Sequence, residues 1–218
     1  DPNILKDQIE AVFEDMKIDA VKSGMLYSKD SVEAIADCLK RFSPKYYVLD
    51  PVMVSTSGSK LITDEAIEAV REMLFPLATL ITPNIEEVRV LTGISVKSVD
   101  DMQRAAEALL DCGCNAVLMK GGHLDGDESV DMLFEKGKDG IGIRSAFVDT
   151  KNTHGTGCTL SSAIASYLAL GEDLKEAFMS AKDYIIHALY AGKDIECGKG
   201  HGPVNHFFNP KSLSGTNF

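Results

Sequence analysis

The 218-residue chain is short of positive charge: it has 22 Lys and Arg against 33 Asp and Glu, which gives a net charge of -11 at pH 7. Binding to a long phosphate backbone requires clustered Lys and Arg that displace counterions, so nucleic acid is not an expected partner. A nucleotide-sized anion remains compatible with this charge, because backbone amides and a few lysines are enough to hold it.

Other absences narrow the class of protein further. The five cysteines are odd in number, and no pair has the C-x-x-C spacing of a zinc or redox site. No apolar run is long enough for a membrane span, and nothing at the N-terminus resembles a signal peptide. The G-x-x-x-x-G-K-[ST] motif of P-loop NTPases does not occur. With 44% hydrophobic and 25% charged residues, the sequence predicts a cytoplasmic globular protein with no membrane contact.

The spacing of apolar residues predicts alternating helices and strands. Helices are expected around residues 9–16 and at 31–41, 64–74, 98–110, 157–170 and 174–191, and strands at 18–21, 46–49, 79–81 and 116–119. Alternation of this kind predicts parallel strands joined by crossover helices. Residues 129–135 and 141–148 flank a turn-prone segment and predict an antiparallel hairpin at a sheet edge. We expect one domain over residues 1–209 and a disordered tail at 210–218.

The segment KNTHGTGCTLS, residues 151–161, places small residues between a strand and an apolar helix. Gly155, Thr156 and Gly157 stand at the expected helix N-terminus, where backbone amides point at an anion. An isolated G-x-G is more often a turn that merely starts a helix. Here a strand precedes the turn and polar side chains surround it, so we expect a phosphate-binding turn.

Polar residues also follow three of the predicted strands. Asp50 ends the strand 46–49, Asn84 and Glu87 follow the strand 79–81, and Lys120 ends the strand 116–119. Each has a structural interpretation: Asp50 as a turn former, Asn84 as an N-cap with an acid in the first helical turn, and Lys120 as a solvated lysine. In open α/β sheets, however, ligands bind at the carboxyl ends of strands.

The loop at residues 198–203 is basic and glycine-rich in an otherwise acidic chain. His201 and His206 suggest a metal, but no third ligand stands at a convincing spacing. We interpret both histidines as loop residues and leave the role of His123 open.

Four strings taken together, KNTHGTGCTLS, DPVM at 50–53, TPNIEE at 82–87 and MKGGH at 119–123, resemble the hydroxymethylpyrimidine and hydroxymethylpyrimidine-phosphate kinases of thiamine biosynthesis. These enzymes belong to the ribokinase superfamily, and the similarity runs from about Ile9 to His206 in the family's order. The resemblance implies an α/β fold, a ribokinase-like three-layer α/β/α sandwich with a mostly parallel central sheet. It also implies ATP as co-substrate, Mg²⁺ as cofactor, a small-molecule pyrimidine substrate and, since relatives are commonly dimers, a homodimer.

The resemblance also assigns roles to residues. Gly155, Thr156 and Gly157 would form an anion hole for the transferred phosphoryl group, which suits a reaction that depends on positioning and charge stabilisation. Glu87 would hold Mg²⁺ through water, because Mg²⁺ keeps much of its hydration. The expected contacts to ATP and its phosphates are Asp50, Asn84, Lys120, Thr153 and Lys199.

Cys158 occupies the position of the family's catalytic base, where most ribokinase relatives have Asp. A helix N-terminus favours a thiolate, although a buried helical cysteine is common. An alcohol substrate benefits from a base, whereas a phosphate substrate needs none and would be repelled by a carboxylate. We hypothesise that Cys158 allows both phosphorylations in one site.

One part of the family pattern has no counterpart in this sequence. Members carry an N-terminal segment with a glycine-rich strand end, an aspartate and a glutamate that hold the pyrimidine. We therefore expect the N-terminal strand region to be lacking, as in a fragment, a protein completed by a second chain, or a compromised enzyme. Two alternatives stay open: a pyridoxal kinase of the same superfamily, and a non-catalytic nucleotide-binding remnant.

Overall fold

The structure is a computed structural model, and it describes residues 1–54, 60–123 and 128–210. Its strands are β1 (Ala20–Ser23), β2 (Tyr46–Leu49), β3 (Leu80–Ile81), β4 (Ala116–His123), β5 (Glu128–Glu135) and β6 (Ile141–Ala146). Its α-helices are α1 (Pro2–Asp15), α2 (Lys29–Phe42), α3 (Asp64–Ala69), α4 (Ile85–Thr92), α5 (Val99–Leu110), α6 (Thr156–Ala169) and α7 (Leu174–Gly192). A π-helical turn and a 3₁₀ turn extend α3 to Leu77.

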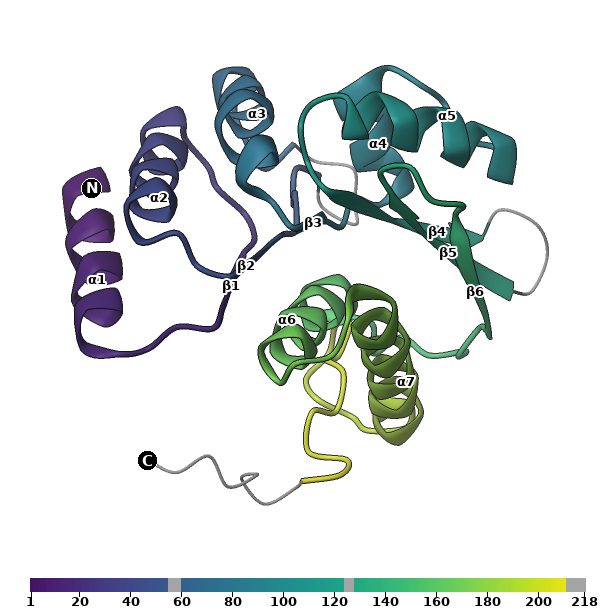
Figure 1. Ribbon diagram of the computed structural model, residues 1–218. Coiled ribbons are helices and arrows are strands. Elements are labelled where there is room, and N and C mark those ends of the chain that lie inside the picture. Colours follow the sequence, from purple (N-terminus) through teal and green to yellow (C-terminus); the bar gives the residue numbers. More distant parts are fainter. Residues whose placement is uncertain (55–59, 124–127, 211–218) are drawn as a thin grey trace.

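The six strands form one sheet in the order β1-β2-β3-β4-β5-β6. Neighbours from β1 to β4 pair in parallel, and β5 and β6 add an antiparallel hairpin. Helices α2 to α5 lie on one side of the sheet with α1 beside α2, and α6 and α7 lie on the other (Figure 1). The predicted three-layer α/β/α sandwich with a mostly parallel sheet is confirmed.

Most predicted elements are found within a residue or two of their expected bounds. Four elements differ. Helix α1 begins at Pro2, seven residues before its expected start, and the first strand starts at Ala20 rather than at residue 18. Strand β4 continues to His123, four residues past its expected end, so Lys120 lies within it, and β6 ends at Ala146, two residues before its predicted end. The predicted disordered tail at 210–218 lies outside the described residues, apart from Pro210. No helix in the described ranges is long and apolar enough to cross a membrane.

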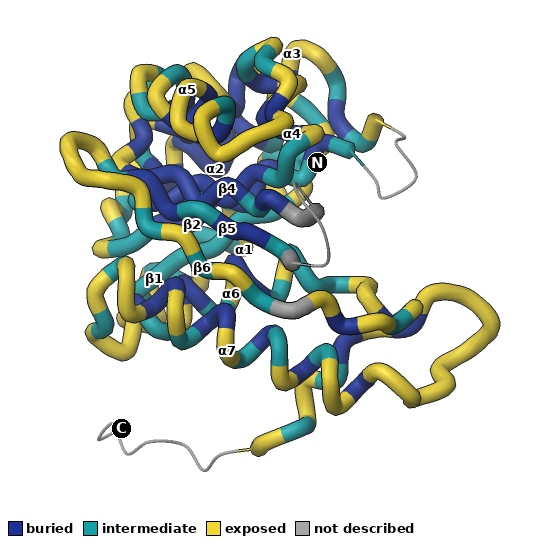
Figure 2. Tube along the Cα trace, turned by 90° about the vertical axis from the view of Figure 1, so that its right-hand side faces the viewer, coloured by how far each residue is buried: buried dark blue, intermediate teal, exposed yellow. Residues whose placement is uncertain are grey.

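Two apolar cores sandwich the sheet. One lies between the sheet and α2 to α5, and the other lies beneath α6 and α7. Successive residues of β2 point to opposite cores, Val48 into the second and Leu49 into the first, and both are buried. This is the pattern of a parallel sheet covered on both faces, and Figure 2 shows the buried path of β2 and β4 through the molecule.

Side-chain caps set where several helices begin, and therefore where the preceding loops point. Ser28, Thr63, Asn84, Ser98 and Asp173 each accept a hydrogen bond from a backbone amide of the following turn. Ser98 and Asp101 form only half of a capping box, because Asp101 accepts from the amide of Lys97 instead of that of Ser98. The box at Asn84 is complete, and it stands at the carboxyl edge of the sheet.

Candidate active site

Asp50 lies at the centre of a polar cluster at the carboxyl ends of β2, β3 and β4. The residue is 1% exposed. Its Oδ1 accepts from Lys120 Nζ at 2.9 Å and from Thr82 Oγ1 at 3.0 Å. Its Oδ2 lies 3.1 Å from Ser161 Oγ and 3.8 Å from Lys22 Nζ. Burial alone would raise the pKa of this carboxyl, but the two ammonium groups and the hydroxyl donors outweigh it and the pKa lies below its usual range.

Lys120 connects this carboxylate to the segment 151–161. Its amide donates to Pro83 O at 2.9 Å, which fixes its backbone beside the start of α4. Burial disfavours the ammonium, but Asp50 and Glu87 more than compensate, so the pKa of Lys120 is raised. Its Nζ lies 3.3 Å from the point where a Cβ on Gly157 would stand. A charged lysine therefore adjoins the predicted phosphate-binding turn.

Asn84 and Glu87 form a capping box at the start of α4. The Asn84 amide donates to Glu87 Oε2 at 2.8 Å, and the Glu87 amide donates to Asn84 Oδ1 at 2.9 Å. Glu87 is only 2% exposed, and burial raises the pKa of its carboxyl although Lys120 acts in the opposite direction. The cap explains the spacing of this pair, and it also holds an acid beside Lys120 and Asp50.

The turn that precedes α6 offers backbone amides that can bind an anion. Gly155 is the N-cap, with φ of 88°, and it provides no side-chain cap. That backbone conformation favours glycine. The Thr156 amide donates to Thr153 O at 3.2 Å, while the amides of Gly157 and Cys158 lie in the first helical turn, where amides have no intrahelical acceptor. They are the groups that a phosphoryl oxygen would meet.

Two predicted residues make no side-chain contact with the polar cluster around Asp50. Thr153 contributes its carbonyl oxygen, which also accepts from Thr156 Oγ1 at 2.7 Å and so shapes the turn. Lys199 is exposed on the loop after α7, and no hydrogen bond or ion pair is recorded for it within the described part of the chain. The two C-terminal histidines bind protein groups, His206 Nε2 to Thr159 Oγ1 at 2.9 Å and His201 Nδ1 to Lys151 O at 3.1 Å.

Sequence reasoning missed three residues of the cluster. Thr82 and Ser161 are fully buried, and both bind Asp50. Ser161 also lies 3.1 Å from the carbonyl oxygens of Gly157 and Cys158, so it ties the first turn of α6 to Asp50. Lys22 follows the apolar residues Ala20 and Val21 in the partly buried strand β1, which was the available signal, because a charge that is drawn into a sheet needs a partner.

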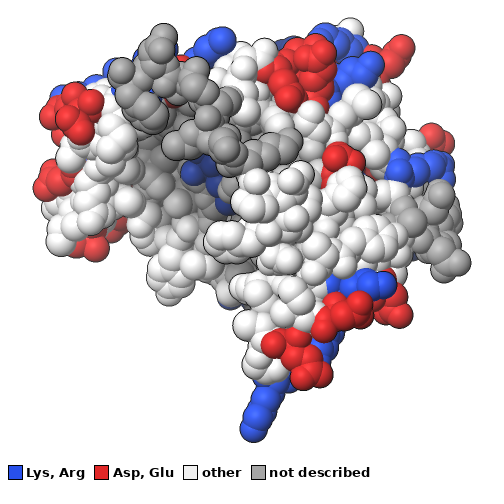
Figure 3. All heavy atoms as spheres, turned by 90° about the horizontal axis from the view of Figure 1, so that it is seen from below, with Lys and Arg blue, Asp and Glu red and all other residues white. Residues whose placement is uncertain are grey.

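A hollow of about 850 Å³ adjoins the turn and is lined by α6, α7 and the C-terminal loop. Its wall includes Gly155, Cys158 and His206, so Cys158 faces open space rather than core. The hollow falls within the usual range for small-molecule sites. On the face seen in Figure 3, which lies on the side of α6 and α7, uncharged surface covers much of the middle, basic atoms lie in a hollow near it, and most other charged side chains gather toward the edges.

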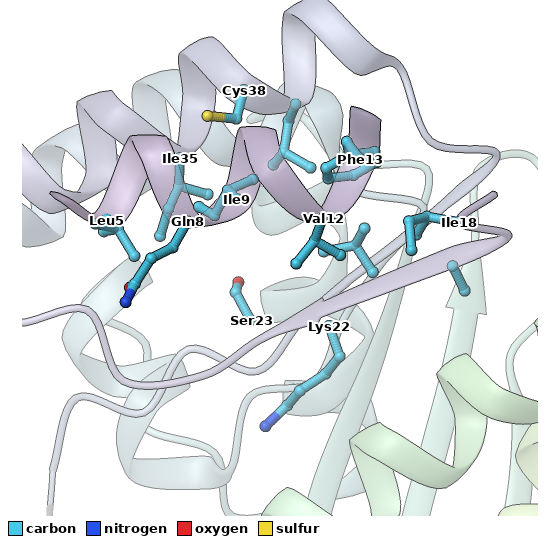
Figure 4. A pocket seen from close by; sticks show the side chains of 13 residues that line it. Leu5, Gln8, Ile9, Val12, Phe13, Ile18, Lys22, Ser23, Ile35 and Cys38 are labelled. Carbon is cyan, nitrogen blue, oxygen red and sulfur yellow. The ribbon is translucent and has the colours of Figure 1, made fainter. Parts of the chain in front are cut away.

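A second hollow, of about 380 Å³, lies between α1, α2 and β1 and is almost entirely apolar. Leu5, Ile9 and Val12 of α1 point into it, as Figure 4 shows. The Lys22 side chain extends away from α1, on the opposite side of β1 (Figure 4), which is the side of Asp50. Alternation along the strand therefore separates the apolar hollow from the polar cluster.

The donor set bears on the predicted Mg²⁺. No group of three or more His, Cys, Asp or Glu within the described ranges is arranged to hold a metal ion by itself. Asp50 and Glu87 offer carboxylate oxygens, the ligand type that Mg²⁺ prefers, but these already accept hydrogen bonds. Such a set fits a Mg²⁺ that takes its direct ligands from phosphate and water.

Comparison with known proteins decides the family. The sequence profile of the family described as phosphomethylpyrimidine kinase matches residues 1–205. The chain belongs to this family. It is 45% identical over 205 residues to the hydroxymethylpyrimidine/phosphomethylpyrimidine kinase of Rhizobium meliloti, with 94% of this chain and 76% of that protein covered. The resemblance inferred from the four strings is confirmed, and with it a kinase, that is, a phosphotransferase.

Solved structures support the same grouping. The phosphomethylpyrimidine kinase of Clostridium difficile matches with 48% identity and a TM-score of 0.75, covering 87% of this chain and 77% of that one. An ADP complex of Bacillus subtilis pyridoxal kinase matches with 35% identity and a TM-score of 0.84, covering 94% and 76%. The ribokinase-like fold, expected from the resemblance, is confirmed by these neighbours.

The chain spans only part of the length of its relatives in the phosphomethylpyrimidine kinase family. It covers 41% of the thiamine biosynthesis bifunctional protein ThiED of Geobacter sulfurreducens, to which it is 46% identical over 208 residues.

Proposed function

We propose that this chain catalyses the ATP-dependent phosphorylation of hydroxymethylpyrimidine and then of its monophosphate to the diphosphate. One observation carries the proposal: the Lys120 ammonium, held by Asp50, lies beside Gly157 in a turn whose amides have no intrahelical acceptor. A fixed cation next to oriented amides stabilises the charge that develops on a transferred phosphoryl group.

In the first step the substrate hydroxyl oxygen attacks the terminal phosphorus of ATP, and the bond from that phosphorus to the bridging oxygen of ADP breaks. Cys158, as its thiolate, takes the hydroxyl proton and becomes a thiol; its side chain is exposed beside the anion hole. In the second step a phosphate oxygen of the monophosphate is the nucleophile and carries no proton that must be removed. The thiol can then remain neutral.

The other residues bind and orient. Amides of Gly157 and Cys158 and the ammonium of Lys120 hold the transferred group, and Asn84 and Lys199 contact the nucleotide phosphates. Mg²⁺, when bound, neutralises phosphate charge, and Glu87 holds its water ligands. Asp50 keeps Lys120 charged and in place, as its short contact and the raised pKa of Lys120 support.

Lys22 is a second cation that pairs with the carboxylate of Asp50. It approaches from β1, at the opposite side of Asp50 from Lys120. Lys22 and Lys120 together offset the charges of Asp50 and Glu87, which would otherwise repel a monophosphate that meets ATP in this site.

Similarity to known proteins favours a pyrimidine substrate over pyridoxal. The family profile is that of phosphomethylpyrimidine kinases, and identity to a solved member of that family is 48%, against 35% to the pyridoxal kinase of Bacillus subtilis. We also propose a homodimer, from the family resemblance, and a cytoplasmic location, from the composition of the sequence.

The test is ADP release by the purified chain with hydroxymethylpyrimidine, its monophosphate and pyridoxal as separate substrates. We expect turnover of both pyrimidines above that of pyridoxal, abolished in Lys120→Met. Calorimetric ATP binding without turnover of any substrate would favour the nucleotide-binding remnant instead. Faster turnover of pyridoxal would overturn the substrate assignment.

A further inference from the structure

Asn152 is a buried polar residue to which the proposed mechanism gives no role. It lies one residue before Thr153, directly upstream of the phosphate-binding turn, and is 2% exposed. Its side-chain amide nitrogen, Nδ2, donates to Gly192 O at 2.7 Å and to Ile195 O at 2.7 Å. Its Oδ1 accepts from the amide of Gly202 at 3.1 Å. Both amide hydrogens and the oxygen therefore have partners.

These partners have a particular arrangement along the chain. Gly192 is the last residue of α7, and its carbonyl oxygen accepts from Asn152 as well as from the Ile195 amide at 3.1 Å. Ile195 and Gly202 are the two ends of the loop that contains Lys199. One side chain thus closes this loop at both ends and ties it to the segment that enters the turn.

Backbone contacts continue the same junction. The His154 amide donates to Gly202 O at 3.1 Å, and the Val204 amide donates to His154 O at 3.2 Å. The approach is so close that a Cβ on Gly202 would stand 2.1 Å from Asn152 Oδ1. Only glycine fits there without displacing Asn152. By contrast, a Cβ on Gly200 in the same loop would meet nothing within 4 Å.

We infer that Asn152 is a positioning residue that fixes the Lys199 loop against the phosphate-binding turn and thereby sets the affinity for ATP. The part concerning ATP rests on the proposed function, in which Lys199 contacts the nucleotide phosphates. A free loop must lose conformational entropy when Lys199 engages a phosphate, whereas a loop clamped at both ends has already lost most of it.

The test compares Asn152→Ala and Gly202→Ala with the matched control Gly200→Ala. Two readouts are used: calorimetric affinity for ATP, and the rate of tryptic cleavage after Lys199 in the folded chain. We expect both clamp variants to weaken ATP binding about tenfold, as for the loss of a buried hydrogen bond, and to accelerate cleavage. The control should match the wild-type chain in both. Gly202→Ala keeps the inference testable if Asn152→Ala does not fold.

A double variant separates positioning from general destabilisation. If Asn152 acts through Lys199, then Lys199→Ala should weaken ATP binding in the wild-type background and add little in the Asn152→Ala background. Additive losses, or ATP binding unchanged in both clamp variants, would overturn the inference. If Lys199→Ala alone leaves ATP affinity unchanged, the proposed role of Lys199 fails. The cleavage rates then still decide whether Asn152 holds the loop.

Discussion

Lys120 and Asp50 form an ion pair of 2.9 Å across the carboxyl edge of the sheet, although the strand β3 lies between their own strands. The carboxylate is almost fully buried and the ammonium is mostly so. A buried pair of this kind adds little stability compared with apolar residues, but removing one member leaves the other charge uncompensated. The pair is therefore best understood as a means of holding a cation at the phosphate-binding turn.

Asp50→Asn should lower the free energy of unfolding by about 3 kcal/mol, because Lys120 and Lys22 lose their carboxylate. Urea unfolding measures this directly. The pKa of Asp50 is lowered in the folded state, so its contribution is present above the usual carboxyl pKa and is lost as pH falls through the lowered value. The difference between wild-type and variant chains should accordingly narrow in acid. A pH-independent difference would mean that the ion pairs do not cause the loss.

Glu87→Gln should have the opposite effect on stability. Burial raises the pKa of Glu87, so the folded state holds the proton more tightly and wild-type stability falls as pH rises through the carboxyl range. The neutral amide avoids this cost and its oxygen can still accept from the Asn84 amide. We expect thermal unfolding a few degrees higher at pH 7, no difference below pH 4, and kinase turnover reduced about tenfold. Lower stability at pH 7 would contradict this account of Glu87.

How far the sequence could predict this site depends on the range of each contact. The capping box at Asn84 and Glu87 is local, and the string alone predicts it. The clamp by Asn152 joins residues about 40 and 50 positions apart, and no periodicity encodes such a pairing. Lys22 was likewise missed because its partner lies on the neighbouring strand β2, and register is set by tertiary packing.

A second buried ion pair shows the same limit of prediction from sequence. Lys182 Nζ of α7 donates to Asp131 Oδ2 at 2.7 Å, and Asp131 Oδ1 accepts from the Gly121 amide at 3.1 Å. That amide lies where the register of β4 and β5 shifts, directly after Lys120. Asp131, a charge in the interior of a strand between apolar residues, was visible in the sequence, but its effect on the backbone beside Lys120 was not.

Gly157→Ala should separate stability from activity. Gly157 lies in the first turn of α6 and has no positive φ, so alanine should preserve or raise stability, by up to about 1 kcal/mol. The new methyl group would stand 3.3 Å from Lys120 Nζ and would occupy space needed by the phosphoryl group. We expect turnover to fall at least 100-fold while urea unfolding is unchanged or shifted upward. Wild-type turnover in this variant would place the transferred phosphoryl group elsewhere.

Cys158→Asp tests why this chain has a cysteine at the base position. A carboxylate beside an incoming phosphate at about 4 Å costs on the order of 4 kcal/mol at the effective dielectric of a protein surface. A neutral alcohol substrate is not repelled, and the carboxylate introduced at position 158 can still act as its base. We therefore expect the variant to keep activity on hydroxymethylpyrimidine within about tenfold and to lose activity on the monophosphate at least 100-fold.

The matched comparison for that variant is Cys158→Ser, which is neutral but a poorer base. It should reverse the order of the losses, with the alcohol affected more than the monophosphate, because only the alcohol must give up a proton in the transfer. Cys197→Ser, at another exposed cysteine, controls for the loss of a thiol as such and should leave both rates unchanged. Equal losses on the two substrates in both Cys158 variants would show that the residue only packs beside the turn, and the charge argument for cysteine at this position would then fail.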